Sequence, residues 1–279
     1  MMYDIVEKIG NNTLIQHGKL NDRIYLMKLH NNDQHDIIND LETLADRKGY
    51  SKIFCKIPAA YAPSFLAKGF ITEAIIPKFY NFEEDAFFIS KFTHKDRLAG
   101  LEKEKLLEFS KLLRTHTVAK SNYQLDSHFS YRLLKPEDAS DIANIYKAVF
   151  KSYPFPIHEA DYIEKTMKEN IFYFGITHNQ QLVAVSSAET DSGSGSCEMT
   201  DFATLPEYRG KKLAQILLNI MEDYILKKNY KTVYTIARLH SIPMNKTFFN
   251  AGYKYAGSLL MNTNIGGKIE TMNVLYKHL

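Results

Sequence analysis

This sequence has no long apolar run, little excess charge and only two cysteines. No apolar stretch approaches the roughly 18–20 residues that span a bilayer, and Met1–Asn12 contains no apolar signal core. The formal net charge is +3, and lysines and glutamates alternate instead of gathering on one face or in a tail. We therefore expect a cytoplasmic protein that binds neither membranes nor nucleic acid.

The cysteines and histidines give no sign of a metal site. Cys55 and Cys197 lie far apart in apolar, strand-like segments, and their spacing fits neither a zinc site nor a disulfide framework. The ten histidines show no metal-ligand pattern either. We predict two buried, reduced thiols and no metal. The sequence contains no indication of the oligomeric state.

Helical and strand-like patterns alternate along the whole chain, with one polar, aperiodic interruption at 119–130. We interpret this interruption as a linker, which predicts two domains, 1–125 and 126–279. The alternation predicts an α/β (α+β) fold with a mixed central sheet in the second domain. Helices are expected at 36–48, 61–68, 96–117, 136–150, 160–169, 213–224 and 244–251, and strands at 23–29, 53–57, 70–76, 86–92, 131–134, 172–177, 182–189, 197–204, 232–237, 253–261 and 269–277.

Two portions of the chain resemble each other. Asp46–Phe54 matches Leu226–Tyr234, and further along Ala67–Phe70 matches Asn250–Tyr253 at nearly the same separation. Either common pieces have converged, or the first domain is a reduced copy of the second. The N-terminal portion has no basic glycine turn before its helix, and it carries acids there instead. We expect polyphosphate chemistry only in the second half.

The turn Arg209–Lys212 has the features of a phosphate site. It is basic, contains Gly210, follows a predicted strand and leads into an apolar-periodic helix. The first N–H groups of a helix have no partner inside the helix, and the helix dipole favours negative charge there. Neither the nucleotide-triphosphate loop nor the Gly-x-Gly-x-x-Gly motif of dinucleotide sites is present.

The segment Arg209–Ala214 resembles the phosphate loop of the GNAT superfamily of N-acetyltransferases, Arg/Gln-x-x-Gly-x-Gly/Ala. It matches at Arg209 and Ala214, whereas Lys212 stands where the middle glycine is usual. The resemblance implies a GNAT fold preceded by a smaller, degenerate GNAT-like domain, and acetyl-CoA as co-substrate. It also implies cofactor contacts from Arg209, Gly210, Lys211, Lys212, Leu213 and Ala214, backbone contacts from Ala203, Thr204 and Leu205, and a contact from Asn245.

Three further segments, 15–23, 152–157 and 198–204, resemble those of β-lysine N6-acetyltransferases. This resemblance implies a small-molecule amine substrate, β-lysine, whose side-chain amine would be acetylated to give a compatible solute. Two alternatives stay open. The acceptor could be another amine, such as a polyamine or a protein lysine, or the chain could be a silent acyl-CoA-binding module.

Two carboxylates precede the basic turn and are candidates for the general base. Glu198 stands where many GNAT relatives carry a base, and Asp201 follows three residues later. Strict strand alternation would point them to opposite faces, so both would reach one substrate only if the strand bulges or splays. Either could instead be an ion-pair partner or a cap. Phe248 occupies the usual position of an acid tyrosine, which leaves water, Tyr253 or Tyr255 for that role and is the feature favouring the silent module.

Four residues are candidates for binding the acceptor. Arg23 and Arg132 could hold the carboxylate of β-lysine, although surface salt bridges would explain either residue. Tyr153 and Phe155, in a stiff Pro-containing loop, could form the wall of the acceptor pocket or simply pack in the core.

Overall fold

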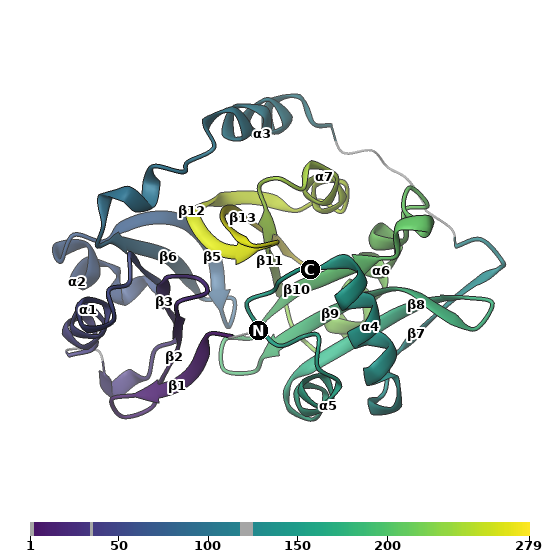
Figure 1. The fold of residues 1–279 in the computed structure, drawn as a ribbon, viewed down its shortest axis with the longest axis horizontal. Helices are drawn as coiled ribbons and strands as arrows, with labels where there is room; N and C mark the ends of the chain where they lie inside the picture. The colour runs from purple at the N-terminus through teal and green to yellow at the C-terminus, as the bar shows by residue number, and fades with distance from the viewer. Residues whose placement is uncertain (1–2, 34–35, 118–124) are drawn as a thin grey trace.

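A computed structural model describes residues 3–33, 36–117 and 125–279 (Figure 1). Its described strands join in one mixed sheet, with the order β1-β2-β3-β4-β6-β5-β12-β13-β11-β10-β9-β8-β7. The N-terminal half contains β1 (Ile5–Ile9), β2 (Thr13–Gly18), β3 (Arg23–Lys28), α1 (Ile37–Lys48), β4 (Lys52–Pro58), α2 (Ala62–Ala67), β5 (Ile71–Tyr80), β6 (Glu84–Phe92) and α3 (Lys103–Thr115).

The C-terminal half provides the rest of the sheet and most of the helices. Its elements are β7 (Phe129–Leu133), α4 (Ala139–Val149), α5 (Ala160–Glu169), β8 (Ile171–His178), β9 (Gln181–Asp191), β10 (Ser196–Thr204), α6 (Leu213–Lys227), β11 (Thr232–Arg238), α7 (Ile242–Asn250), β12 (Lys254–Ile265) and β13 (Lys268–His278). Apolar side chains alternate between two layers: Tyr173 packs with α4 and α5, whereas Phe174 packs with α6.

The two halves repeat one strand order. In the C-terminal half β8 to β11 are followed by β13 and then β12, and in the N-terminal half β1 to β4 are followed by β6 and then β5. The parallel pairs occupy equivalent places, β3 with β4 and β10 with β11. The predicted α/β class with a mixed sheet is confirmed, and the shared order supports an internal copy that lacks an equivalent of β7.

The halves meet where β5 lies beside β12 (Figure 1). Gly257 pairs with Ala74 there and has a φ of 153°, and a Cβ at Gly257 would lie 2.0 Å from the carbonyl oxygen of Glu73. The sheet also folds over on itself, because Tyr25 and Phe54 of the N-terminal half share one cluster with Tyr234 of β11. One face of the β3–β4 pair and one face of the β10–β11 pair therefore line a common space.

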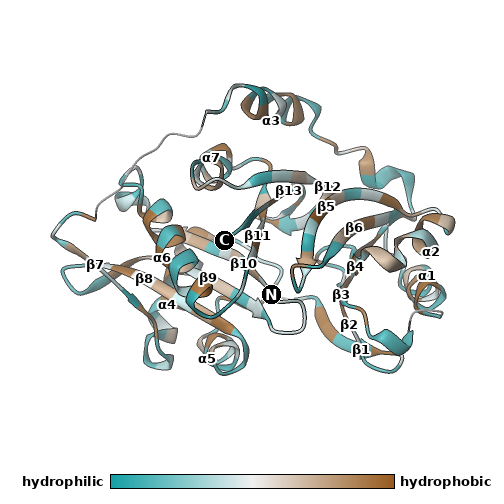
Figure 2. Ribbon diagram, turned by 180° about the vertical axis from the view of Figure 1, so that it is seen from behind, coloured by the Kyte–Doolittle hydropathy of each residue, from teal (hydrophilic) through white to brown (hydrophobic). Residues whose placement is uncertain are grey.

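Two local features differ from the prediction. Ile5–Ile9 forms an exposed edge strand that the charged N-terminal sequence had not suggested. The helix predicted over 96–117 is split into a 3₁₀ turn, Lys95–Leu98, and α3. This split occurs because Arg97 is buried, with its guanidinium fixed on the carbonyls of Met261 and Asn21. Along α3, Figure 2 shows hydrophobic residues (brown) among hydrophilic ones (teal), as in an amphipathic helix.

Helix α3 packs its Phe109 against Phe249 of α7, so it covers the C-terminal core although it precedes the expected linker. Part of that linker, 119–124, lies outside the described residues, and the limits 1–125 and 126–279 stay a prediction. Cys55 and Cys197 are buried and free, as predicted. Within the described ranges, no helix is long and apolar enough to cross a membrane.

Candidate active site

A bulge in β10 builds the centre of the site. The strand pairs regularly with β9 up to Thr200, then skips to Ala203, and Asp201 within this bulge has a left-handed φ of 57°. The parallel pairing of β10 with β11 ends at Glu198, so the two strands diverge beyond it. Bulge and splay together meet the condition under which Glu198 and Asp201 can serve one substrate.

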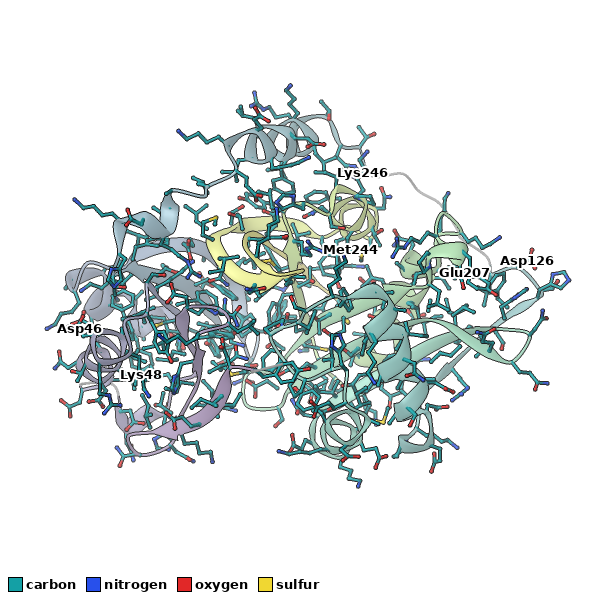
Figure 3. The ribbon with its side chains drawn as sticks, viewed as in Figure 1. Asp46, Lys48, Asp126, Glu207, Met244 and Lys246 are labelled. Carbon is teal, nitrogen blue, oxygen red and sulfur yellow. The ribbon has the colours of Figure 1, made fainter. Side chains whose placement is uncertain are left out.

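Both carboxylates line one cavity of about 1370 Å³. Residues at the bulge and splay of β10 line it, and the N-terminal half contributes Arg23, Tyr25 and Lys56. Met244 of α7, labelled in Figure 3, contributes to its wall. The cavity therefore lies between the two copies of the repeated fold.

Glu198 is mostly shielded from solvent and lies directly opposite Glu189 of β9. Burial raises the pKa of Glu198 to about 8, with a further contribution from the charge of Glu189. The ammonium of Lys56 and the hydroxyl of Tyr234 oppose this rise in pKa. A carboxyl group with a pKa near neutrality is suited to accept a proton.

Asp201 is held by hydroxyl groups on both of its oxygens. Tyr153 donates to Oδ1, and Ser187 donates to Oδ2 at 2.6 Å. Burial raises the pKa of Asp201, and these hydrogen bonds oppose the rise. Tyr153 also lines the cavity, as does Phe155 from the same loop. The structure thus places three predicted residues, Asp201, Tyr153 and Phe155, around one space with Glu198.

The basic turn before α6 has a tightly coiled backbone. Gly210 has a φ of 81°, and Lys212, the N-cap of α6, has a φ of 61° and a ψ of 21°. Lys212 therefore adopts the left-handed conformation that a glycine at that position would take without strain. Arg209, Gly210, Lys212, Leu213 and Ala214 line the cavity, whereas the exposed Lys211 does not.

Ala203, Thr204 and Leu205 were expected to offer backbone groups. Of these, Thr204 directs its backbone N–H toward the splay between β10 and β11. The N–H of Leu205 donates to the carbonyl of Val183 on β9 at 3.0 Å, so it is not available to a ligand. Because bonding alternates along an antiparallel strand, Ala203 also faces β9 and the N–H of Thr204 faces away from it. The expectations for Ala203 and Leu205 are thereby corrected, because the backbone of both faces β9.

Arg132 is in the wrong place to bind the acceptor. It lies on β7 at the outer edge of the sheet, is exposed and holds both carboxylate oxygens of Asp138 at 2.6 and 2.7 Å. The prediction that it binds a substrate carboxylate is wrong. Its role is the surface salt bridge that was the alternative.

Asn245 is also corrected. Its side chain is completely buried and lies outside the cavity. The amide donates to the carbonyls of Arg238 and Ser241 at 2.9 and 2.8 Å and accepts from Asn273 at 3.0 Å. Every polar atom of the side chain is thereby used to join α7 to β11 and β13, which leaves none for a cofactor.

Arg23 lies in the cavity wall, as the acceptor prediction requires. It is only 4% exposed, and its Nη1 donates to the carbonyl of Asn262 at 2.6 Å and to Thr263 Oγ1 at 3.0 Å. No carboxylate in the described part of the chain lies within salt-bridge distance of it. A buried guanidinium without an acidic partner has the charge to bind an anion.

The structure provides no tyrosine in the cavity at the three positions considered for the general acid, 248, 253 and 255. Phe248 lines the cavity and packs against Phe202, with ring centroids 5.5 Å apart. Tyr253 is buried outside the cavity, and Tyr255 shares a 2.7 Å hydrogen bond with Ser258, also outside it. Neither tyrosine is positioned to protonate a group in the cavity.

Sequence reasoning missed Glu189, Lys56, Tyr234 and Asn262, all of which line the cavity. A lone lysine between Cys55 and Ile57, in an apolar strand, was the one available signal for Lys56. The pairing of Glu189 with Glu198 depends on strand register, which the sequence does not specify.

Comparison with known proteins identifies this arrangement. Residues 140–248 match the acetyltransferase (GNAT) family. The β-lysine N(6)-acetyltransferase of Methanococcus maripaludis is 39% identical over 270 residues, which cover 96% of each chain. The chain belongs to the GNAT acetyltransferase family. A second relative of this acetyltransferase, the β-lysine N(6)-acetyltransferase of Methanosarcina mazei, is 28% identical and covers 86% of the chain and 95% of its own length.

Among solved structures, the ribosomal-protein-S18-alanine N-acetyltransferase from Escherichia coli aligns with a TM-score of 0.48 and 15% identity. The alignment covers 54% of this chain and 93% of the Escherichia coli chain.

The acetyltransferase is an N-acetyltransferase that uses acetyl-CoA as co-substrate. The turn at 209–214 suits the diphosphate of this molecule, since it combines basic side chains with the open N-terminus of α6. In the ranges that the structure covers, no group of three His, Cys, Asp or Glu side chains is arranged to hold a metal ion. The absence of a metal stays a prediction.

Proposed function

We propose that this enzyme acetylates the side-chain amine of β-lysine, giving N6-acetyl-β-lysine, a compatible solute. The observation that carries the proposal is the polarity of the cavity. The buried Arg23 lines it on the N-terminal side, and Glu189, Glu198 and Asp201 line it on the β9–β10 side. β-Lysine has a carboxylate at one end and an amine at the other, so it complements both. The two relatives named for this reaction support the same substrate.

Glu198 is proposed as the general base. A lysine-like amine has a pKa of about 10.4 and must lose a proton before it attacks a thioester. Glu198 has a pKa of about 8, so it is deprotonated in a useful fraction of molecules near neutral pH. Asp201 has hydroxyl donors on both oxygens and is better placed to orient the ammonium than to remove its proton.

Acetyl-CoA supplies the acetyl thioester. Arg209, Gly210 and Lys212 are proposed to hold its diphosphate at the start of α6, with Lys211, Leu213 and Ala214 completing the turn. The N–H of Thr204 is proposed as the hydrogen-bond donor to the acetyl oxygen, because it faces the splay between β10 and β11. Tyr153 and Phe155 are proposed as walls of the acceptor pocket.

The test measures CoA release with β-lysine and with 1,4-diaminopentane, which is β-lysine without its carboxylate. The wild type should prefer β-lysine, and Arg23→Met should lower kcat/KM for β-lysine by about tenfold to a hundredfold while changing 1,4-diaminopentane much less. Arg132→Met, at the outer edge of the sheet, is the matched control and should leave the preference unchanged.

Two results would contradict the proposal. Rapid release with polyamines or α-lysine but not with β-lysine would show another acceptor. Binding of acetyl-CoA without release in the presence of any amine would instead support a silent acyl-CoA-binding module.

A further inference from the structure

Two buried polar atoms in the cavity wall lack partners. They are Nε of Arg23 and Oδ1 of Asn262, and no group in the described ranges bonds to either. The two residues are 4% and 1% exposed, and both line the cavity. They also touch, because Nη1 of Arg23 donates to the backbone carbonyl of Asn262 at 2.6 Å. An unpaired donor and an unpaired acceptor thus belong to two residues in contact, and each costs free energy unless a ligand binds it.

Asn262 reaches this position through a bulge in β12. Register with β13 is lost between Leu259 and Thr263, and Met261 has a left-handed φ of 44°. Three consecutive carbonyls are thereby freed from the ladder. Buried cations of the N-terminal half bind all three: Lys52 Nζ donates to Leu260 at 2.8 Å, Arg97 Nε to Met261 at 2.8 Å and Arg23 Nη1 to Asn262 at 2.6 Å.

We propose that Asn262 recognises the second amine of the acceptor, the one close to its carboxylate. This inference rests on the proposed function and adds a residue that determines specificity. Arg23 would bind the carboxylate, and Oδ1 of Asn262 would accept a hydrogen bond from the neighbouring ammonium. Carboxylate and 3-amine lie only a few bonds apart in β-lysine, which suits two side chains in direct contact. One ligand head would then satisfy both unpaired atoms.

The charges around the cavity fix the direction of the substrate. Arg23 lines the cavity at the β12 bulge, whereas Glu189 and Glu198 line it from β9 and β10. A carboxylate is favoured at the first end and the reacting amine at the second. The 3-ammonium would lie between them, where a hydrogen bond to Oδ1 of Asn262 compensates the loss of its hydration.

The experiment compares β-lysine with 6-aminohexanoate, which lacks only the 3-amine. Wild-type enzyme should favour β-lysine by about tenfold or more in kcat/KM, as expected for one buried hydrogen bond to a charged group. Asn262→Leu should abolish this preference, so that kcat/KM for β-lysine and for 6-aminohexanoate become similar. Asn262→Asp should keep the preference, because its carboxylate also accepts from an ammonium.

The ratio of the two substrates is measured on one preparation, so it does not depend on how much of a variant is folded. Asn264→Leu is the matched control: it lies on the same strand, its amide donates to the carbonyl of Leu20 at 3.0 Å and it does not line the cavity. It should keep the wild-type ratio. If the wild type acetylates β-lysine but Asn262→Leu keeps the wild-type ratio of kcat/KM for the two substrates, the role of Asn262 is overturned and the proposed function is not. No turnover of β-lysine by the wild type overturns the proposed function and this inference with it.

Discussion

At the scale of single residues, the most informative contact is the one between two acids. Glu198 and Glu189 pair across β10 and β9. Burial raises the pKa of both carboxyl groups, and the charge of Glu189 raises the pKa of Glu198 further. Lys56 is the cation that faces both, and its ammonium lies 3.2 Å from the hydroxyl of Tyr234. Asp201 on the same strand and Tyr25 on β3 complete the titratable groups around Glu198. This environment keeps Glu198 largely protonated until the pH approaches 8.

The pH profile should report Glu198 directly. Because burial and Glu189 raise its pKa to about 8, kcat/KM should rise about tenfold per pH unit below pH 8 and level above it. Glu198→Gln has no carboxylate to deprotonate the acceptor amine, so it can use only the amine molecules that are already neutral. Its rate should be about a hundredfold lower at pH 8 and should keep rising toward the amine pKa of about 10.4. A profile of the same shape in both proteins would exclude Glu198 as the base.

The sequence placed Glu198, Asp201, Tyr153, Phe155 and Arg23 at one site, and the structure brings them together. The prediction from sequence failed for Arg132 and Asn245. Local spacing of residues encodes neither the edge position of β7 nor the burial of a side chain on α7. Asn262 carried no signal at all. Its exposure to the cavity depends on a bulge held by residues that lie more than 150 positions earlier in the chain.

At the scale of elements, the turn before α6 depends on two residues with positive φ. Gly210 has open space around its α-carbon, so its role is conformational and not steric. Lys212 accepts the left-handed conformation although it has a Cβ, at a cost of about 1 kcal/mol. The sequence predicted the turn but left its geometry in question, since Lys212 stands in a glycine position.

Gly210→Ala tests whether this geometry serves the cofactor. The substitution forces a Cβ into a φ of 81°, which should cost about 1 kcal/mol and raise KM for acetyl-CoA severalfold while KM for the acceptor changes little. Gly252→Ala is the matched control, because Gly252 has a φ of 87° and equally open surroundings at the end of α7. It should lose similar stability with no change in KM. Equal kinetic effects in the two variants would contradict a role for the turn in cofactor binding.

At the scale of the whole molecule, the two halves are joined by buried charges as well as by apolar packing. Lys52 and Glu73 form an ion pair at 2.8 Å whose side chains are 0% and 2% exposed. Glu73 also accepts from the N–H of Leu260 at 2.7 Å, while Lys52 donates to the carbonyl of the same residue. The pair therefore replaces ladder bonds that β12 loses at its bulge.

Lys52→Met should destabilise the protein by about 3–5 kcal/mol, because it leaves the Glu73 carboxylate buried without its cation. Denaturant unfolding monitored by circular dichroism measures the difference. Lys105→Met removes one partner of an exposed helical pair with Glu108 and should cost at most about 0.5 kcal/mol. If both variants lost the same small amount, the buried pair would not be holding the halves together.

The repeated order of strands was anticipated from short matches such as Asp46–Phe54 with Leu226–Tyr234. How the copies face each other was not, since the contact between Tyr25, Phe54 and Tyr234 depends on the curvature of the whole sheet. Helix α3 shows the same limit: its apolar face was visible in the sequence, but the core that it covers was not.

The N-terminal copy carries Asp33 before its helix, and that carboxylate is bound by the N–H groups of Asn11 and Thr13 and by the Thr13 hydroxyl. The N-terminal copy thus has an anion bound by its own β1–β2 turn shortly before α1, whereas the other copy has its basic turn before α6. Relieved of cofactor binding, this copy can vary the residues that it presents to the cavity, Arg23 and Lys56 among them, without disturbing the use of acetyl-CoA. The part of acceptor recognition that lies in the N-terminal half is thus encoded apart from the cofactor turn, so selection can change it while the turn stays fixed.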